Sequence, residues 1–256
     1  MKHKEIAKVI SQESIATGVY SMWIQTKDIA AKAVAGQFIS VYCKDGAKLL
    51  PRPISICEVN KEEGTLRIVY RVVGGGTTEM SGYVSGDDID ILGPLGNGFM
   101  QREGKKAILI GGGIGIPPMV QLGKELKEIA EVQTVAGYRD ELFLIDELEK
   151  NGDVYIATED GSTGTKGTVI DAIKACAVTG DVIYACGPTP MLRAIKEYAL
   201  ANDIECQISL EEKMACGIGA CLGCVCKSKE KDHHTNVNNK RICKDGPVFL
   251  AQEVEL

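Results

Sequence analysis

The chain has 256 residues, of which 45% are hydrophobic and 25% charged, so it can form two or three globular domains. Its net charge is −6 and it has no basic stripe, which argues against a nucleic-acid partner. No apolar run is long enough to span a membrane, and the first residues lack the apolar core of a signal peptide. We therefore expect a cytoplasmic protein without a membrane partner. In that reducing compartment, ten cysteines indicate metal ligation rather than disulfides.

Residues 1–99 have the pattern of an antiparallel barrel. Six short segments are rich in β-branched or aromatic residues, and turn residues separate them without a long helical pattern between them. Six such strands predict a closed β-barrel that ends at the glycine- and proline-rich boundary 93–98. The expected strands are 6–10, 18–25, 37–42, 54–59, 66–73 and 87–92.

Two loops of this barrel have the composition of anion-binding sites. The first is the Arg-Pro-Ile-Ser run at 52–55, in which the fork of Arg52 can clamp a pyrophosphate and Ser55 offers a backbone and a hydroxyl donor. The second is the glycine-rich run 74–78, ahead of a short helix. Arg52 taken alone could be an ordinary surface charge. Two such loops on one barrel nevertheless favour a phosphorylated cofactor.

From about residue 105, strands alternate with helices. This alternation predicts a doubly wound parallel sheet over residues 100–210, whose last strand leads directly into a cysteine-rich tail. The expected strands are 107–110, 132–136, 154–157, 182–185 and 204–210. The expected helices lie near 168–175 and 191–202, with a first one carrying Met119, Leu122, Leu126 and Ile129.

A glycine-rich turn at 111–115 connects the first of these strands to its helix. In the pattern Gly113-x-Gly115-x-x-Pro118, the glycines allow a close backbone approach, and the helix N-terminus favours an anion. Proline suits the first turn of that helix. Taken alone, such a turn also serves tight packing between strand and helix.

Two later loops follow parallel strands at the same carboxyl edge, where ligands bind in such sheets. They are residues 158–161 and the run Cys186-Gly187-Pro188. Three loops at one edge predict a dinucleotide site. Cys186 could position a nicotinamide ring or could be a buried core thiol. Arg139 could meet a 2′-phosphate, but Asp140 beside it would repel one, so NAD and NADP both stay open.

The tail, residues 211–256, holds five of the ten cysteines. Cys216, Cys221 and Cys224 have the C-x4-C-x2-C spacing of a plant-type [2Fe–2S] site, and Cys243 offers a fourth thiol before an Asp-Gly-Pro turn. Glycines between them can turn backbone N–H groups toward the cluster sulfurs. Cys226 is the alternative fourth ligand. A structural zinc ion is the alternative metal, although zinc sites usually pair two C-x2-C knuckles.

These motifs together resemble the ferredoxin–NADP reductase superfamily, in which a barrel with Arg-Pro-x-Ser precedes a nicotinamide domain with Cys-Gly-Pro. The tail runs 214–221 and 243–249 are similar to the electron transfer subunits of type B dihydroorotate dehydrogenases. Similarity also extends over 51–55, 93–99 and 186–192, so the resemblance covers essentially the whole chain.

The resemblance implies FAD on the barrel domain 1–99, NAD at the sheet edge of domain 100–210, and a [2Fe–2S] cluster in domain 211–256. Many relatives have an aromatic residue where this chain has Ile54, so only packing against a flavin is expected there. By the family motifs, FAD contacts would fall on Arg52, Pro53, Ile54, Ser55, Val69, Tyr70, Arg71, Gly76 and Thr77.

The chemistry of the three cofactors suggests their order. A nicotinamide exchanges hydride, a cluster carries single electrons, and a flavin can do both. Electrons would enter at the cluster and leave as hydride to NAD⁺, with no general base required. Dihydroorotate oxidation needs its own flavin site, typically a (β/α)₈ barrel of ~250 residues, for which this chain has no length left. The resemblance therefore implies an FMN-containing catalytic subunit as partner, two of each in a heterotetramer, in pyrimidine (UMP) biosynthesis.

Two other functions fit parts of the sequence. The chain could be an NAD(P)H-linked flavin and iron–sulfur subunit of another complex, of the sulfhydrogenase or ferredoxin reductase type, because the fold and cofactors would be the same. It could also be a non-enzymatic binding module with a structural zinc ion in its tail. That function leaves the phosphate-binding loops unexplained.

Overall fold

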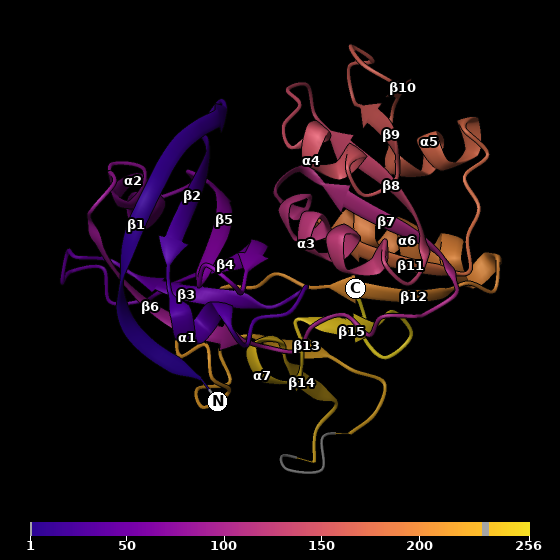
Figure 1. Ribbon diagram of the computed structural model, residues 1–256. Helices are drawn as coiled ribbons and strands as arrows, with labels where there is room; N and C mark the ends of the chain where they lie inside the picture. Colours follow the sequence, from indigo (N-terminus) through magenta and orange to yellow (C-terminus); the bar gives the residue numbers. More distant parts are fainter. Residues whose placement is uncertain (1, 232–235) are drawn as a thin grey trace.

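The computed structural model describes residues 2–231 and 236–256, and it has three parts (Figure 1). A β-barrel lies on the left of the view, an α/β sheet lies at the upper right, and the C-terminal tail runs beneath the junction of the two. The predicted order of barrel, parallel α/β sheet and small tail is confirmed. Within the described ranges, every helix is too short or too polar to cross a membrane.

Six antiparallel strands close the barrel in the order β1-β2-β5-β4-β3-β6. Their side chains alternate between the inside and the outside, and the inward set forms one hydrophobic core. The strands are β1 (His3–Ala16), β2 (Val19–Gln25), β3 (Phe38–Tyr42), β4 (Arg52–Asn60), β5 (Thr65–Arg71) and β6 (Asp88–Leu95). Two short helices lie between them, α1 (Lys27–Ala30) and α2 (Gly75–Met80).

Strand β1 is much longer than the predicted segment 6–10, because it serves two neighbours. Its first half pairs with β6 and its second half with β2, with Lys8 common to both. Register shifts after Val9 and after Ser14 mark irregularities that bend the strand, as closing a barrel requires. The polar run 11–14 (Ser-Gln-Glu-Ser) explains why the hydrophobic pattern missed this second half.

The second part is a seven-stranded sheet in the order β10-β9-β8-β7-β11-β12-β15. Its first six strands are parallel, and α3 and α4 pack on one face while α5 and α6 pack on the other. The predicted doubly wound sheet is thus confirmed, although the first helix ends at Leu126, before Ile129. The elements are β7 (Lys106–Gly112), a 3-10 turn η1 (Gly113–Gly115), α3 (Pro117–Leu126), β8 (Glu131–Tyr138), α4 (Ile145–Glu149), β9 (Asp153–Thr158), β10 (Thr165–Lys166), α5 (Val169–Ala175), β11 (Val182–Cys186), α6 (Thr189–Ala201) and β12 (Glu205–Ser209).

The tail adds the seventh strand, which the sequence analysis did not predict. Strand β15 (Val248–Leu250) pairs antiparallel with β12. Before it come β13 (Val225–Lys227), β14 (Asn239–Arg241) and the short helix α7 (Ile242–Asp245). Strands β13 and β14 pair antiparallel at the two ends of the polar segment 227–240. Its polar pattern indicates that His233 and His234 are solvated, but both lie outside the described residues.

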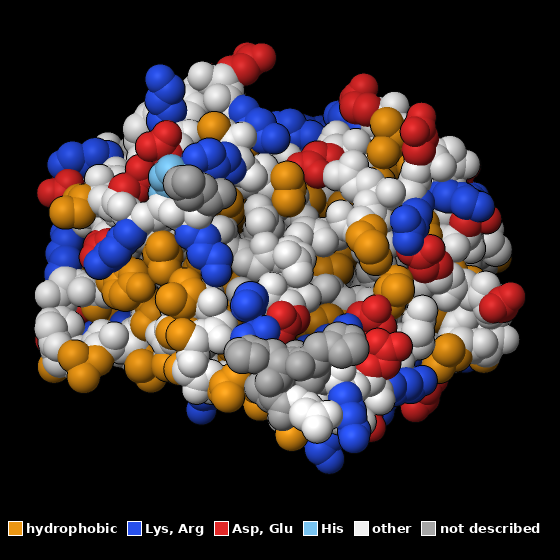
Figure 2. Space-filling view, turned by 90° about the horizontal axis from the view of Figure 1, so that it is seen from below, with side chains coloured by type: hydrophobic (Ala, Val, Ile, Leu, Met, Phe, Trp, Pro, Cys, Tyr) orange, Lys and Arg blue, Asp and Glu red, His pale blue; other side chains and the backbone are white. Residues whose placement is uncertain are grey.

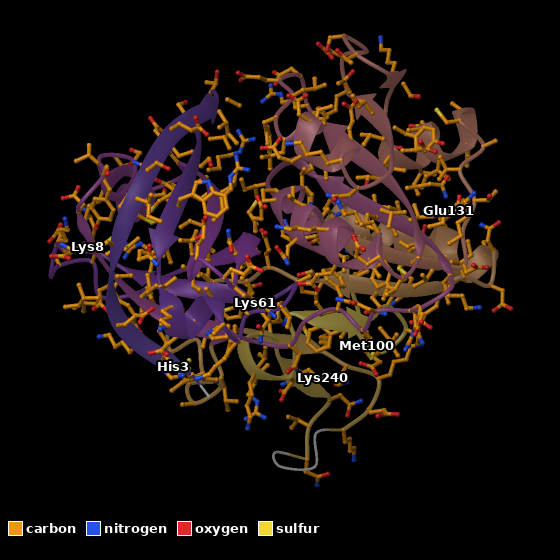
Figure 3. The ribbon with its side chains drawn as sticks, in the orientation of Figure 1. His3, Lys8, Lys61, Met100, Glu131 and Lys240 are labelled. Atoms are coloured by element: carbon orange, nitrogen blue, oxygen red, sulfur yellow. The ribbon has the colours of Figure 1, made fainter. Side chains whose placement is uncertain are left out.

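Polar bonds fix the barrel against the sheet. The backbone N–H of Val59 in β4 donates to Gln121 Oε1 of α3 (2.8 Å), and buried Arg67 in β5 pairs with Glu147 of α4 (2.9 Å). Met100, labelled in Figure 3, lies on the connection between the two parts, where its N–H donates to Gln207 Oε1 (2.8 Å). These bonds fix the position of the barrel relative to the sheet.

Candidate functional site

A cavity of about 510 Å³ lies where the barrel, the sheet and the tail meet. Cofactor and small-molecule sites typically have volumes of about 300–1,000 Å³. The predicted run 52–55 forms one wall, and Ile114 of the glycine-rich turn belongs to the wall on the sheet side. The remaining lining residues are Phe38, Val69, Tyr70, Arg71, Val73, Thr77, Ser209, Leu210, Glu211, Glu212, Lys213, Met214 and Pro247.

Arg52 lies directly over Gly76, so the structure brings the two predicted anion loops together. A Cβ atom on Gly76 would lie 1.7 Å from Arg52 Nε, so a larger residue there would displace the Arg52 guanidinium. Arg52 Nη1 donates to the carbonyl oxygens of Leu50 (2.5 Å) and Lys48 (3.3 Å). Thr77 Oγ1 accepts a bond from the backbone N–H of Val73 (2.9 Å), which shapes the loop before α2.

Strand β5 also lines this cavity, and the side chains of its successive residues point to opposite faces of the strand. The side chain of Val69 packs with the core between barrel and sheet, whereas Tyr70 is buried inside the barrel and its hydroxyl donates to Gln12 Oε1 (2.7 Å). Tyr70 also borders the cavity. Arg71, the exposed last residue of the strand, lines this cavity and a second one.

The second cavity, also about 510 Å³, opens at the carboxyl edge of the sheet. Gly113, with φ +52°, and Arg71 line it. Arg139 and Asp140, the pair that the sequence analysis connects with a 2′-phosphate, line it too. The other lining residues are Ala16, Thr17, Val19, Tyr138, Glu141 and Phe143. Because Arg71 lines both cavities, a ligand in one lies close to a ligand in the other.

The glycine-rich turn packs tightly on the Cys-Gly-Pro loop. A Cβ on Gly115 would lie 2.3 Å from the Cys186 carbonyl oxygen, and one on Gly112 would lie 2.4 Å from Met191 Sδ. Glycine is therefore required at position 115, where the neighbour is backbone, whereas a side chain at position 112 would displace the end of Met191. Pro118 is buried in the first turn of α3, where it starts the helix rather than lining either cavity.

The side chain of Cys186 is fully buried in the core and lies outside the lining of both cavities. Burial raises the pKa of its thiol well above the ordinary value, so the group is a neutral thiol. A Cβ on Gly187 would lie 2.4 Å from Met191 Cε, and Pro188 is the N-cap of α6. This environment favours the core-thiol interpretation of Cys186.

The tail loop 216–221 turns its backbone N–H groups onto the Cys216 sulfur. The N–H groups of Ile218 (3.5 Å) and Ala220 (3.3 Å) donate to Cys216 Sγ. Burial acts to raise the pKa of Cys216, but hydrogen bonds from these groups and from Cys221 outweigh it and hold the pKa at about 6. Such a loop stabilises a thiolate, the form that binds metals.

The four predicted ligands form two pairs. Cys221 lies close enough to Cys216 to lower the pKa of its thiol, and Cys224 lies close enough to Cys243 to raise the pKa of that thiol. The Cys243 N–H also donates to Cys224 Sγ (3.4 Å). Burial raises the pKa of Cys243 to about 12. Two pairs suit a two-iron cluster, in which each iron takes two thiolates. Among the described residues, no three His, Cys, Asp or Glu side chains are arranged around a single ion.

Cys226 belongs to a different environment. Its thiol donates to the Lys240 carbonyl oxygen (3.6 Å) across the β13–β14 pair, and burial raises its pKa. Cys226 therefore stabilises the pairing of β13 with β14. Lys240 of β14 (Figure 3) also forms an ion pair with Glu253 (2.9 Å). The contrast with buried Cys243 favours Cys243 as the fourth ligand.

Residues 211–255 match the family model of the iron–sulfur cluster binding domain of dihydroorotate dehydrogenase B. The chain is 43% identical to the dihydroorotate dehydrogenase B (NAD(+)) electron transfer subunit of Caldanaerobacter subterraneus subsp. tengcongensis, with 99% of each chain covered. It belongs to this family of electron transfer subunits. The subunit from Listeria monocytogenes is 47% identical over 97% of this chain and 98% of that one.

A solved structure shares the fold of this electron transfer subunit over nearly its whole length. The NADH-dependent reduced ferredoxin-NADP oxidoreductase, studied for flavin-based electron bifurcation, is 31% identical with a TM-score of 0.88, over 98% of this chain and 90% of that chain. A ferredoxin reductase of carbazole 1,9a-dioxygenase shows the shared fold alone, at 21% identity and a TM-score of 0.67 over 79% and 67% of the chains. The resemblance found from the sequence motifs is thus confirmed.

The sequence analysis assigned no ligand-binding role to the segment 209–214, which forms a wall of the first cavity. The available signal was its position directly after the last parallel strand, at the ligand-binding edge. Glu211, Glu212 and Lys213 line the cavity from this segment. Desolvation raises the pKa of the Glu211 carboxyl, although the residue keeps an exposed surface.

Proposed function

We propose that this chain takes electrons from a catalytic subunit that oxidises dihydroorotate and passes them to NAD⁺, in pyrimidine (UMP) biosynthesis. The observation that carries the proposal is that the cysteine-containing tail forms part of the wall of the first cavity. The cavity beside Arg52 is also lined by Met214 and Pro247, which flank the two cysteine loops of the tail. Groups bound in the cavity and at the cysteines would therefore be separated by only a few side chains.

The first cavity fits FAD in volume and in chemistry. Arg52 and the Gly76–Thr77 turn supply positive charge and backbone donors for a pyrophosphate, while Ile54 and Val69 offer an apolar surface for a ring system. When bound, a flavin exchanges hydride with a nicotinamide and single electrons with an iron–sulfur cluster. The proposed FAD contacts are Arg52, Pro53, Ile54, Ser55, Val69, Tyr70, Arg71, Gly76 and Thr77.

The NAD site is proposed at the carboxyl edge of the sheet. The second cavity, with Gly113 and two arginines, would hold its phosphates next to the flavin. Of the other residues of the site, Gly115, Pro118 and Cys186 are buried, Gly187 packs on Met191, and exposed Pro188 caps α6. They would shape the turns there rather than touch the ligand.

The cluster site is proposed at Cys216, Cys221, Cys224 and Cys243. Their pairing and the N–H groups aimed at Cys216 fit a [2Fe–2S] cluster. The proposed division of the chain is then 1–99 for FAD, 100–210 for NAD and 211–256 for the cluster. All ten cysteines are free, which supports a reducing, cytoplasmic setting.

The partner would dock where the cluster site reaches the surface. Cys221 is exposed, and around it Ile218, Leu222 and Val225 are exposed by 43%, 50% and 38%. The underside of the molecule shows hydrophobic side chains grouped between lysines and arginines (Figure 2). Exposed apolar side chains of this kind are typical of a protein–protein contact. We propose an FMN-containing catalytic subunit as the partner, in a heterotetramer with two copies of each chain.

A visible spectrum of the anaerobic protein tests this function. Flavin and cluster absorption should bleach on addition of dihydroorotate only when the catalytic subunit is present, and NAD⁺ should restore the absorption. Bleaching by NADH without any response to dihydroorotate in the complex would contradict the proposal. That result would support the second candidate, a subunit of another flavin-linked complex, which the likeness to the ferredoxin-NADP oxidoreductase favours.

A further inference from the structure

A buried hydroxyl without a partner lies where the barrel meets the cysteine loop of the tail. Ser40 of β3 has no exposed surface, and its Oγ is the single buried side-chain nitrogen or oxygen in the described ranges that has no hydrogen-bond partner. Buried polar groups are nearly always satisfied, because leaving one unpaired costs free energy. An orphaned hydroxyl therefore indicates that a ligand supplies the missing partner.

The position of Ser40 points to the cluster. A Cβ on Gly217 would lie 2.9 Å from Ser40 Oγ, so the hydroxyl lies against the loop that begins at Cys216. Gly217 has φ +65°, and glycine there allows both this close approach and the turn of the loop. On the other side, Ser40 pairs with Pro53 of the Arg-Pro-Ile-Ser motif in the β3–β4 register.

Alternation along β3 accounts for this orientation. Ile39 and Val41 belong to the barrel core, whereas Phe38 packs in the core that contains Cys224 and Cys243. Ser40 shares the outward face with Phe38, because side chains on a strand repeat every second residue. The hydroxyl thus projects out of the barrel and toward the cysteine loops.

We propose that Ser40 donates a hydrogen bond to a sulfur atom of the bound [2Fe–2S] cluster or of its Cys216 ligand, and so raises the reduction potential of the cluster. The inference rests on the proposed cluster site. Hydrogen bonds to the sulfurs stabilise the more negative, reduced state. The other donors to these sulfurs are backbone N–H groups within the tail itself. Ser40 differs because it comes from the barrel that would hold FAD.

The test is an EPR-monitored redox titration of the cluster in the full chain with its catalytic subunit, using dithionite rather than dihydroorotate. Loss of a hydrogen bond to a charged acceptor should change the oxidised-to-reduced ratio about tenfold, so Ser40→Ala should lower the midpoint potential by about 59 mV. Iron content and FAD content should stay the same. Because dihydroorotate is not used, the outcome is independent of the proposed electron source.

A matched pair of variants separates the hydrogen bond from packing. Thr and Val have nearly the same shape, so Ser40→Thr and Ser40→Val should disturb the tight site equally and differ only in the hydroxyl. The Val variant should show the lower potential of the pair. Equal potentials in Thr and Val variants, or a wild-type potential in Ser40→Ala with full iron content, would overturn the proposal.

Discussion

At the scale of single residues, the proposed sites depend on very close approaches. Arg52 lies over Gly76, and Ser40 over Gly217, so a side chain at either glycine would displace the neighbouring residue. The sequence identified Arg52 and the cysteine spacing, because a charge and a ligand spacing are visible locally. It could not identify Ser40, since a serine in a barrel strand carries no local signal of what lies outside the barrel.

Replacing Arg52 should weaken FAD binding. Its guanidinium is the group that would bond a pyrophosphate in the first cavity, and a hydrogen bond to a charged group contributes about 1.5–3 kcal/mol. Arg52→Ala should therefore bind FAD about ten- to a hundredfold more weakly. Titration of the FAD-free protein with FAD measures this. Arg139→Ala, in the second cavity, is the control and should bind FAD normally. Equal FAD affinity of wild type and Arg52→Ala would rule out this role.

Cys243 and Cys226 should differ in whether the protein needs them to hold its iron–sulfur cluster. Cys243→Ser removes a buried thiol paired with Cys224, so the protein should retain little or no cluster. Cys226→Ser removes only a weak bond to Lys240, so iron and sulfide per chain should match wild type. Iron analysis and the visible spectrum distinguish the two variants. The reverse result would make Cys226 the fourth ligand.

At the scale of elements, a charged cluster joins the loop before β4 to helix α2. Glu79 accepts bonds from Lys48 Nζ (2.9 Å), the Lys44 N–H (2.6 Å) and the Tyr83 hydroxyl (3.1 Å). Burial acts to raise the pKa of Glu79, but these bonds outweigh it and hold the pKa at about 2. These bonds to Glu79 thereby keep the loop before β4 in place beside Arg52, which lies in β4.

The low pKa of Glu79 predicts how the stability of the protein depends on pH. The folded-state pKa lies below the unfolded value of 4.5, so the stabilisation by ionised Glu79 is complete above that value and is lost as pH falls toward 2. Glu79→Gln should therefore be less stable than wild type at pH 7, with a difference that shrinks between about pH 4.5 and 2. Urea unfolding across this range measures it. A difference independent of pH would show that the charge is not responsible.

At the scale of the whole molecule, the three parts share their cores. Phe38 and Leu95 of the barrel pack in one cluster with Cys224, Cys243 and Phe249 of the tail. In addition, Asn97 after β6 donates from its backbone N–H to the Gly246 carbonyl (2.6 Å). The tail is thus built onto both the barrel and the sheet, which fixes the cysteine loops relative to the first cavity.

A chain that ends at residue 210 should accordingly be much less stable. It loses β15 and the buried side chains of Ile242, Phe249 and Val254, each of which contributes about 1.5–3 kcal/mol by burial. A loss of about 5 kcal/mol or more should lower the melting temperature by about 10 °C or more. The full chain stripped of iron with a chelator is the control, because it keeps this core. Equal melting of the two proteins would show that only the cluster stabilises the fold.

The sequence by itself determined the fold class, the glycine-rich turns and the cysteine spacing, because strand and helix periodicity, glycine content and ligand spacing are local properties of the chain. The tertiary structure decided which other segments of the chain these loops lie against. The wall at 209–214, the seventh strand β15 and the contact of Ser40 with Gly217 all join segments far apart in sequence. Such contacts depend on packing and register between elements, which no local pattern specifies.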